Sequence, residues 1–360
     1  MAVAHDWLTI PGGSEKVVLA LLDLFPHADL FTSIYDPSPW PPAITRRAVT
    51  ASFLNRVPRA RTIYPKLLPL MDRGFRSFDL RSYDLVLSSN HACAKNVRKP
   101  PGVPHVCYCH TPMRYAWDTA FLELEDLGRA ARLGVRGMAP HLRRRDRAAA
   151  QAGRGPDIVI ANSTFVAQRI RSYWGREARV IHPPVDVGRF AEVVHQPEDY
   201  YLYLGRLVPY KRAGLAVSAC AALGRPLKVV GGGRAFESLR ACAGRATKFL
   251  GHVPDEELPE LLGGARALLF PGEEDFGIVP VEAQAAGLPV IAYDAGGVRD
   301  TVVDGVTGAL FGDPTVQGLC SAIERFEGLT LADRDLRQRA ARFTPQRFAD
   351  RFVEVIDSLG

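Results

Sequence analysis

Residues 267–293 read ALLFPGEEDFGIVPVEAQAAGLPVIAY, and this stretch decides the fold class. The apolar run 267–270 ends at a Pro-Gly pair, a helical pattern follows, and a second apolar run covers 289–293. A strand, a helix and another strand in succession predict a βαβ unit in a parallel sheet. The N–H groups at the start of the helix lack helical acceptors and present partial positive charge to a ligand such as a diphosphate. The residues at this position are Phe276, Gly277, Ile278 and Val279.

Two carboxylates accompany this helix. Glu274 precedes it and Glu282 lies within it, eight residues later. Carboxylates beside a diphosphate site suit hydrogen bonds to hydroxyl groups rather than contacts with phosphate. The stretch therefore predicts a ligand that carries both phosphates and hydroxyls.

The alternation of short apolar runs and helical patterns extends along the whole chain. The expected strands are 1–4, 27–33, 84–88, 104–109, 157–161, 201–204, 227–230, 247–250, 267–270 and 289–293, with helices such as 14–25 and 256–264 between them. A Pro-rich polar segment, 183–199, separates the two halves. We therefore predict an α/β protein of two Rossmann-like, doubly wound domains that face a cleft, with ligands beyond the carboxyl ends of the strands.

The size and the charge support this organisation. A chain of 360 residues fits two domains. Residues 1–175 hold 24 Lys and Arg against 14 Asp and Glu, whereas residues 176–360 hold 21 against 25. The basic excess concentrates in 46–81 and 129–147, which suits an anionic membrane surface, a lipid diphosphate or a nucleic acid. Solvated helix faces in an Arg-rich chain would give the same pattern.

A second basic element follows the strand 201–204. In Gly205-Arg206-Leu207-Val208-Pro209-Tyr210-Lys211, the two cations leave a strand end and approach a helix start, where they can converge on one anion. The strand 227–230 then runs into a glycine turn that contains Gly232, and the strand 247–250 is followed by His252 and Val253. A glycine turn after a strand is by itself a weak signal.

The first half contributes two further elements. Gly12 and Gly13 follow the first strand, and glycines let backbone N–H groups approach a ligand closely. His110 follows the strand 104–109 and begins the string HTPMRYAWD, residues 110–118. A histidine at the end of such a strand is expected to point into the ligand site.

Together these motifs resemble the retaining GT-B glycosyltransferases of family 4 (group 1), and the string 110–118 resembles a subgroup that includes bacterial O-antigen mannosyltransferases. The motifs that match are G-R-x4-K, E-x7-E, the Gly12-Gly13 loop and the histidine. The resemblance implies an acceptor-binding domain, 1–183, a nucleotide-sugar-binding domain, 184–345, and a helix, 346–360, that crosses back to the N-terminal domain.

The resemblance also implies roles for the residues. Arg206 and Lys211 neutralise the donor diphosphate, Glu274 holds hydroxyls of the donor sugar, and Glu282 holds the ribose. His110 contacts the transferred sugar. The remaining donor contacts are implied for Gly12, Gly13, Gly205, Gly232, His252 and Val253 together with the start of the helix at 276–279.

The expected reaction is transfer of a hexose, with mannose favoured, from GDP-mannose or next a UDP-sugar, with retention at the anomeric carbon. The expected acceptor is a hydroxyl of a lipid-linked glycan or another glycoconjugate precursor. No cofactor or metal is expected, because Arg and Lys supply the positive charge. The alternatives are a GT-B sugar-nucleotide 2-epimerase and a glycosyltransferase that acts on a small natural product.

Other function classes are less well supported. The D-x-D string at 333–335 lies in a charged helical stretch and is expected to be a solvated face rather than a metal site. A nucleic-acid partner is not expected, because the arginines lack interleaved aromatic residues and no recognition motif is present. The six scattered cysteines are expected to be reduced core residues. The N-terminus lacks a signal pattern, so we expect a cytoplasmic protein. The basic segments would allow this protein to attach peripherally to the inner face of the cell membrane.

Overall fold

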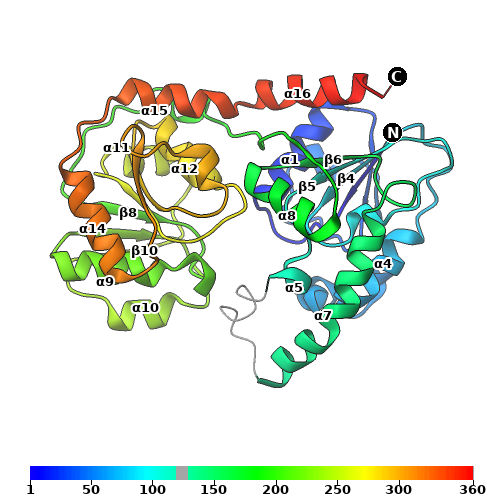
Figure 1. The fold of residues 1–360 in the computed structure, drawn as a ribbon, viewed down its shortest axis with the longest axis horizontal. Helices are drawn as coiled ribbons and strands as arrows, with labels where there is room; N and C mark the ends of the chain where they lie inside the picture. The colour runs from blue at the N-terminus through cyan, green and yellow to red at the C-terminus, as the bar shows by residue number, and fades with distance from the viewer. Residues whose placement is uncertain (119–128, 360) are drawn as a thin grey trace. The chain divides into compact units, whose positions relative to one another are not determined.

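The computed structural model describes residues 1–118 and 129–359. These form two compact units (Figure 1): unit 1 holds residues 1–118, 129–184 and 345–359, and unit 2 holds residues 185–344. Within the described residues, no helix combines the length and the apolar character that a membrane span requires.

Unit 1 contains a parallel sheet of seven strands in the order β3-β2-β1-β4-β5-β6-β7. The strands are β1 (Ala2–His5), β2 (Asp29–Thr32), β3 (Val49–Ala51), β4 (Val86–Asn90), β5 (His105–Cys109), β6 (Ile158–Ala161) and β7 (Arg179–Val180). The helices are α1 (Gly13–Leu24), α2 (Pro42–Thr45), α3 (Ala60–Ile63), α4 (Leu68–Arg76), α5 (Arg114–Trp117), α7 (Arg129–Ala149), α8 (Thr164–Trp174) and α16 (Pro345–Asp357). Short 3-10 turns include η1 (Phe53–Arg56), η2 (Tyr64–Leu67) and η3 (Ala94–Asn96).

Unit 2 contains a parallel sheet of six strands in the order β10-β9-β8-β11-β12-β13. The strands are β8 (Tyr201–Leu204), β9 (Leu227–Val230), β10 (Thr247–Gly251), β11 (Leu268–Phe270), β12 (Val290–Tyr293) and β13 (Gly308–Phe311). The helices are α9 (Ala213–Leu223), α10 (Phe236–Cys242), α11 (Leu258–Gly263), α12 (Ile278–Ala285), α13 (Val298–Thr301), α14 (Val316–Glu327) and α15 (Asp333–Ala340), and the 3-10 turns are η4 (Gly188–Phe190), η5 (Pro209–Lys211) and η6 (Ala341–Phe343).

Helices cover both faces of each sheet. Successive residues of a strand therefore pack into two different cores, one on each face. In β1, Ala2 and Ala4 join one cluster of buried residues, and Val3 joins another. In β8, Tyr201 and Leu202 divide in the same way. This two-sided burial explains why the strands are continuously apolar, and it confirms the predicted pair of doubly wound sheets.

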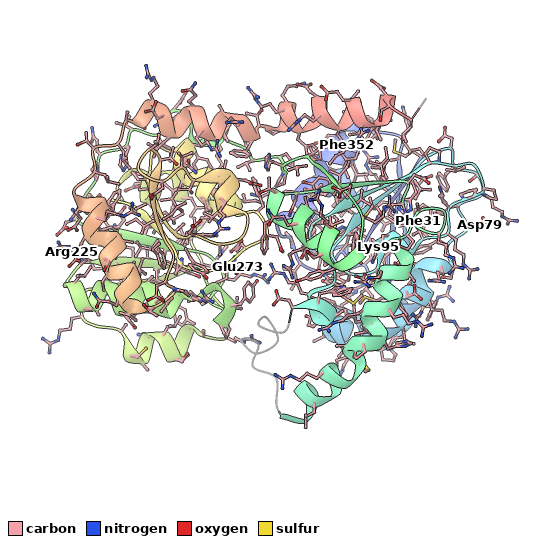
Figure 2. The ribbon with its side chains drawn as sticks, viewed as in Figure 1. Phe31, Asp79, Lys95, Arg225, Glu273 and Phe352 are labelled. Atoms are coloured by element: carbon pink, nitrogen blue, oxygen red, sulfur yellow. The ribbon has the colours of Figure 1, made fainter. Side chains whose placement is uncertain are left out.

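The helix α16 follows unit 2 in the chain but packs in unit 1 (Figure 1). Phe348 and Phe352 join the cluster that contains Val18 and Leu22 of α1. Figure 2 labels Phe352, whose ring lies 6.3 Å from that of Phe25 just after α1. The apolar face of α16 is therefore part of the core of unit 1.

The sequence did not predict three strands, β3, β7 and β13. Two of them are very short, with three and two residues, and none of the residues of β3 or β7 is fully buried. Such edge strands carry little hydrophobic pattern, since their order comes from pairing with a neighbour. The predicted core role of the cysteines is wrong for Cys242, which is exposed, and correct for the other five.

Candidate active site

The predicted anion-binding residues of unit 2 gather where the strand order reverses. The chain moves outward from β8 to β10 on one side and from β11 to β13 on the other. The loops after β8 and β11 therefore diverge at this point, which is where open α/β sheets bind ligands. Arg206 and Lys211 follow β8, and Glu274 follows β11.

The structure brings Lys211 and Glu274 into direct contact. The Lys211 ammonium lies 2.7 Å from the Oε1 atom of Glu274, and the two side chains are 17% and 22% exposed. Gly272 permits this approach, since a Cβ atom there would lie 2.8 Å from the Cα atom of Lys211. A residue with a side chain at position 272 would push the two loops apart.

Tyr203 of β8 lies beside this ion pair. Its side chain is buried. Burial, followed by the charge of Glu274 and the neighbouring Tyr210, raises the pKa of Tyr203, so the phenol stays protonated. Sequence reasoning missed this residue because it reads as a core position of an apolar strand.

Arg206 lies on the same loop and is exposed. Its guanidinium group donates a hydrogen bond to the hydroxyl of Tyr210 at 3.0 Å. The side chain can therefore reach a ligand without breaking a buried contact. Gly205 precedes it, and its N–H donates to the carbonyl of Val230, which joins the loop to the end of β9.

The loop that carries Glu274 is fixed by the paired glycines after β12. The N–H of Gly297 donates to the carbonyl of Glu274 at 2.8 Å. A Cβ atom on Gly297 would lie 2.3 Å from the Cα atom of Phe276, so any other residue would displace the loop. The paired glycines after β12 thus hold the backbone of the loop that carries Glu274.

The helix α12 begins at Ile278, as predicted. Gly277 precedes it with φ of +90°, and Phe276 is buried against Phe343 with ring centroids 5.5 Å apart. The first N–H groups of any helix have no acceptor within the helix, and those of α12 include Ile278 and Val279. Glu282 lies within the helix and is half-buried.

The remaining predicted donor contacts lie on the β9 and β10 side of the sheet. The carbonyl of Gly232 accepts a hydrogen bond from Leu207, which ties the glycine turn to the loop after β8. His252 is exposed, whereas Val253 is buried in the core. The side chain of Val253 therefore packs in the core, and Val253 can offer a ligand only its backbone atoms.

In unit 1, the predicted Gly12-Gly13 loop follows β1, where the strand order reverses between β1 and β4. Gly12 caps α1 and is exposed together with Gly13. A Cβ atom on Gly12 would lie 3.0 Å from the Oε2 atom of Glu15, so this loop lies directly over a buried carboxylate.

His110 follows β5 and is almost completely buried. Its Nε2 atom lies 2.8 Å from the hydroxyl of Ser89, and its backbone is held by Asn90 and Asn162. Burial, together with the nearby His91 and His5 rings, lowers the pKa of His110 well below its usual range, so the ring is neutral at pH 7.

The structure reveals a polar cluster that sequence reasoning missed. The cluster surrounds His110, and the ring centroid of His91 lies 5.6 Å from that of His5 and 6.2 Å from that of His110. Its other members are His5, Asp6, Glu15 and Ser89. The signal was present in the sequence, because β1 ends at His5 and is followed by Asp6, while β4 ends in Ser-Ser-Asn and is followed by His91. Polar residues at the carboxyl ends of adjacent buried strands meet at one edge.

Asp6 fixes the backbone of this cluster. Its buried carboxylate accepts four backbone N–H groups, from His91, Ala92, Cys93 and Ala94, at 2.5 to 2.8 Å. Burial opposes ionisation, but His91 and these donors outweigh it and lower the pKa of Asp6.

The aromatic string after His110 serves the structure of unit 1. Asp146 of α7 accepts the indole N–H groups of Trp117 and Trp174 at 2.7 and 2.6 Å. The same carboxylate pairs with the ammonium group of Lys95, which Figure 2 labels, at 2.5 Å. Both charged side chains are fully buried, so this contact joins α5, α7, α8 and η3.

The basic stretch 129–147 contains no Phe, Trp or Tyr, but two of its arginines contact an aromatic ring of another segment. Trp117 stacks on Tyr173 at 4.7 Å, and Arg143 and Arg147 lie over its ring. Both guanidinium groups also donate to backbone carbonyls, those of Ala116 and Tyr173. These contacts of the two arginines form only in the folded chain and could not be predicted from the order of residues in the sequence. Arg129 and Arg132 of this stretch lie where side chains are not described.

The D-x-D string behaves as predicted. Asp333 begins α15 and pairs with Arg337, one turn later, at 2.8 Å. This ion pair lies within the first turns of α15, on a side chain that is exposed as predicted.

Comparisons with known proteins place these features in context. Residues 187–346 match the family model described as "Glycosyl transferases group 1", and residues 11–189 match "Glycosyltransferase Family 4". The chain is 32% identical over 216 residues to a glycogen synthase of Mycobacterium tuberculosis. This match covers 55% of this chain and 51% of that protein.

Two further matches are informative. The chain is 32% identical over 202 residues, 48% of this chain and 53% of the other, to a GDP-mannose-dependent alpha-(1-6)-phosphatidylinositol monomannoside mannosyltransferase of Mycolicibacterium smegmatis. The sucrose-phosphate synthase of Thermosynechococcus elongatus has the same fold, with a TM-score of 0.73, 21% identity and coverage of 100% and 99% of the two chains. The sequence matches span about half the length of the curated relatives.

Proposed function

Because this chain belongs to the GT-B glycosyltransferases of family 4 (group 1), we propose that it transfers a hexose from a nucleoside diphosphate donor to an acceptor hydroxyl. The observation that carries the proposal is the contact of Lys211 with Glu274 at the strand-order reversal of unit 2. A cation and a carboxylate at one point match a ligand that joins a diphosphate to a hydroxyl-rich sugar.

In this proposal, Lys211, Arg206 and the start of α12 bind the diphosphate. They stabilise the negative charge that develops on the leaving group, which is the largest catalytic contribution expected of such a site. Glu274 binds hydroxyls of the donor sugar, and Glu282 binds the ribose. His110, neutral and buried in unit 1, contacts the transferred sugar.

We propose that the reaction retains the configuration at the anomeric carbon. The acceptor oxygen bonds to this carbon on the face from which the diphosphate leaves, and the acceptor proton passes to the departing phosphate. Glu274 is paired with Lys211, which supports a binding role over a nucleophilic one. Proton NMR of the product would reveal its anomeric configuration, and an inverted product would exclude this mechanism.

Metal independence is part of the proposal, since the cations Arg206 and Lys211 supply the positive charge that a metal would otherwise contribute. Transfer activity is expected to be unchanged after dialysis against EDTA. Loss of activity that added Mg²⁺ or Mn²⁺ restores would contradict this expectation.

GDP-mannose is the favoured donor, supported by the similarity to a GDP-mannose-dependent mannosyltransferase, and a UDP-sugar is next. The first test is the thermal stabilisation of the purified protein by GDP, UDP, ADP and dTDP without metal. Lys211→Ala should abolish most of the shift. Lys248→Ala, which removes an exposed lysine from β10 of the same sheet, is the matched control.

One nucleotide that stabilises the wild type and the control but not Lys211→Ala would identify the donor base. If no nucleotide stabilises the wild type, the donor site is misassigned. A 2-epimerase would also bind the nucleotide, but it would convert the sugar nucleotide without an acceptor, and this reaction would distinguish it.

For the acceptor, we propose a lipid-linked glycan reached at an anionic membrane surface from the cytoplasmic side. The basic segment 46–81 supports this, since Phe53 is 43% exposed and Leu70 is 48% exposed among its cations. Apolar side chains within a basic surface are typical of interfacial binding.

Sedimentation with vesicles tests this part of the proposal. The protein should bind vesicles with anionic lipid in preference to neutral ones, and Leu70→Ser should weaken binding. Val194→Ser, an exposed apolar residue in unit 2, is the control. Equal sedimentation with both vesicle types would refute membrane binding and favour a small soluble acceptor.

A further inference from the structure

Four side chains of unit 1 form a continuous hydrogen-bonded chain that ends at His110. The Oε1 atom of Glu15 lies 3.1 Å from Nε2 of His5. The Nδ1 atom of His5 lies 3.0 Å from the hydroxyl of Ser89. The same hydroxyl lies 2.8 Å from Nε2 of His110. The chain thus crosses from α1 through β1 and β4 to the end of β5.

All four side chains are buried, and His5 and Ser89 are completely inaccessible. Glu15 is ionised at neutral pH: burial opposes its charge, but the hydrogen bond and charge of His5 outweigh this and lower the pKa of Glu15. The carboxylate is therefore an acceptor, and His5 must carry a proton on Nε2.

The direction of the chain then depends on the other nitrogen of His5. In neutral His5, Nδ1 accepts the Ser89 hydroxyl, so the hydroxyl oxygen accepts a hydrogen bond from His110, which must be protonated on Nε2. In charged His5, Nδ1 donates to Ser89, whose carbonyl also lies 3.2 Å away. The Ser89 hydroxyl is then able to donate to His110, which must be protonated on Nδ1.

We propose that Glu15, His5 and Ser89 are positioning residues that determine which ring nitrogen of His110 carries its proton. A proton gained by His5 reverses the hydrogen bonds and changes Nδ1 of His110 from an acceptor to a donor. This inference rests on the proposed function, in which His110 contacts the transferred sugar, because the tautomer decides whether His110 accepts from or donates to a sugar hydroxyl.

Other ionisable groups surround this chain and belong to the same electrostatic environment. Asp6 and His91 face His5, the latter with ring centroids 5.6 Å apart. The ring of Tyr108 lies 5.2 Å from that of His110. Burial raises the pKa of Tyr108 far above its usual range, so Tyr108 stays neutral throughout the titration of a histidine.

The tautomers can be measured without any substrate. Long-range proton–nitrogen NMR of the whole protein, labelled with ¹⁵N-histidine, distinguishes a protonated ring nitrogen from an unprotonated one. In the wild type, His110 should change from an Nδ1-protonated to an Nε2-protonated ring as the pH rises through the titration of His5. His110 itself should remain neutral throughout.

Ser89→Ala should uncouple the two rings, so that the tautomer of His110 no longer follows His5. The matched control is Ser88→Ala, on the same strand, which removes a hydroxyl that lies 2.8 Å from a different buried histidine, His105. It should leave the His110 signals unchanged. Glu15→Gln keeps an acceptor but removes the charge, so the reversal should move to lower pH; this variant serves if Ser89→Ala does not fold.

A His110 tautomer that is constant across the His5 titration, or that is the same in Ser89→Ala as in the wild type, would overturn the inference. Once a donor is known, Ser89→Ala should lower kcat by about tenfold or more with little change in KM, and should change the pH profile of kcat. The NMR result stands apart from the proposed function, since a coupled tautomer without nucleotide binding would refute the transferase proposal alone.

Discussion

Replacement of Glu274 by glutamine should strengthen the binding of the nucleoside diphosphate while it impairs transfer. In the structure, the carboxylate of Glu274 lies 2.7 Å from the ammonium of Lys211. A bound diphosphate must compete with this carboxylate for the lysine. Glutamine has nearly the same shape but no charge, so it removes both the competition and the repulsion between the carboxylate and the phosphates.

The size of the effect follows from the exposure of the pair. Exposed ion pairs contribute about 0.2–1 kcal/mol, whereas breaking a fully buried pair costs about 3–5 kcal/mol. Lys211 and Glu274, with side chains 17% and 22% exposed, lie between these limits. After a discount for solvent screening, we expect about 1.4 kcal/mol, which corresponds to a tenfold lower Kd for the nucleoside diphosphate.

Isothermal titration with the nucleoside diphosphate and with its sugar conjugate is the assay. The sugar nucleotide should gain less affinity than the diphosphate, because it loses the charge-assisted hydrogen bond from its hydroxyls to Glu274. Transfer should fall by about 10²-fold or more, since the sugar is no longer held in place. Glu273→Gln, at the neighbouring position that Figure 2 labels, is the control and should leave both affinities near those of the wild type.

Weaker binding of the nucleoside diphosphate to Glu274→Gln would refute this reasoning. That result would mean that Glu274 orients Lys211 toward the phosphates instead of competing with them. An equal gain for the diphosphate and the sugar nucleotide would refute the assignment of Glu274 to the sugar.

Three further predictions concern the frame around the sites. Asp146→Ala should destabilise unit 1 by about 3–5 kcal/mol in denaturant unfolding because it leaves Lys95 charged and buried, and Asp146→Asn, which also removes the charge but keeps a hydrogen-bond acceptor, should cost less; an unchanged free energy of unfolding in both variants would show that the charge is unimportant. The lowered pKa of Asp6 means that its contribution to stability is complete above its ordinary pKa of 3.8 and is lost as the pH falls through the lower value in the folded protein. The free energy of unfolding of Asp6→Asn should therefore depend less on pH below about 4, and an unchanged acid transition would contradict this. Gly297→Ala should displace the backbone of Phe276 and reduce nucleotide-induced thermal stabilisation, and an unaltered shift would show that this loop does not bind the donor.

Much of the fold was predictable from local pattern. Ten apolar runs became ten strands, and the helix start at Ile278 was correct, because a Pro-Gly pair followed by a helical pattern indicates a strand–helix junction. The edge strands β3 and β7 were not predictable, since pairing with a neighbour rather than burial of their own side chains determines them.

The candidate site divides in the same way. Arg206, Lys211 and Glu274 stand in compact motifs, so sequence reasoning found each of them. The cluster around His110 was missed because its members come from three strands and a helix, and His5 and Ser89 are 84 residues apart in the chain. A hydrogen bond over such a separation leaves no periodic signal, so only the polar residues at the ends of adjacent strands indicate the cluster.

The sequence by itself determined the two doubly wound sheets and the charged side chains of the proposed donor motifs, because hydrophobic period and motif spacing are local properties of the chain. The tertiary structure alone decided that Lys211 pairs with Glu274, that Trp174 and Asp146 enclose Lys95, and that Ser89 links two histidines. The physical reason is that a parallel sheet brings the carboxyl ends of distant strands to one edge, and the polar groups there satisfy one another according to distances that only the folded chain sets.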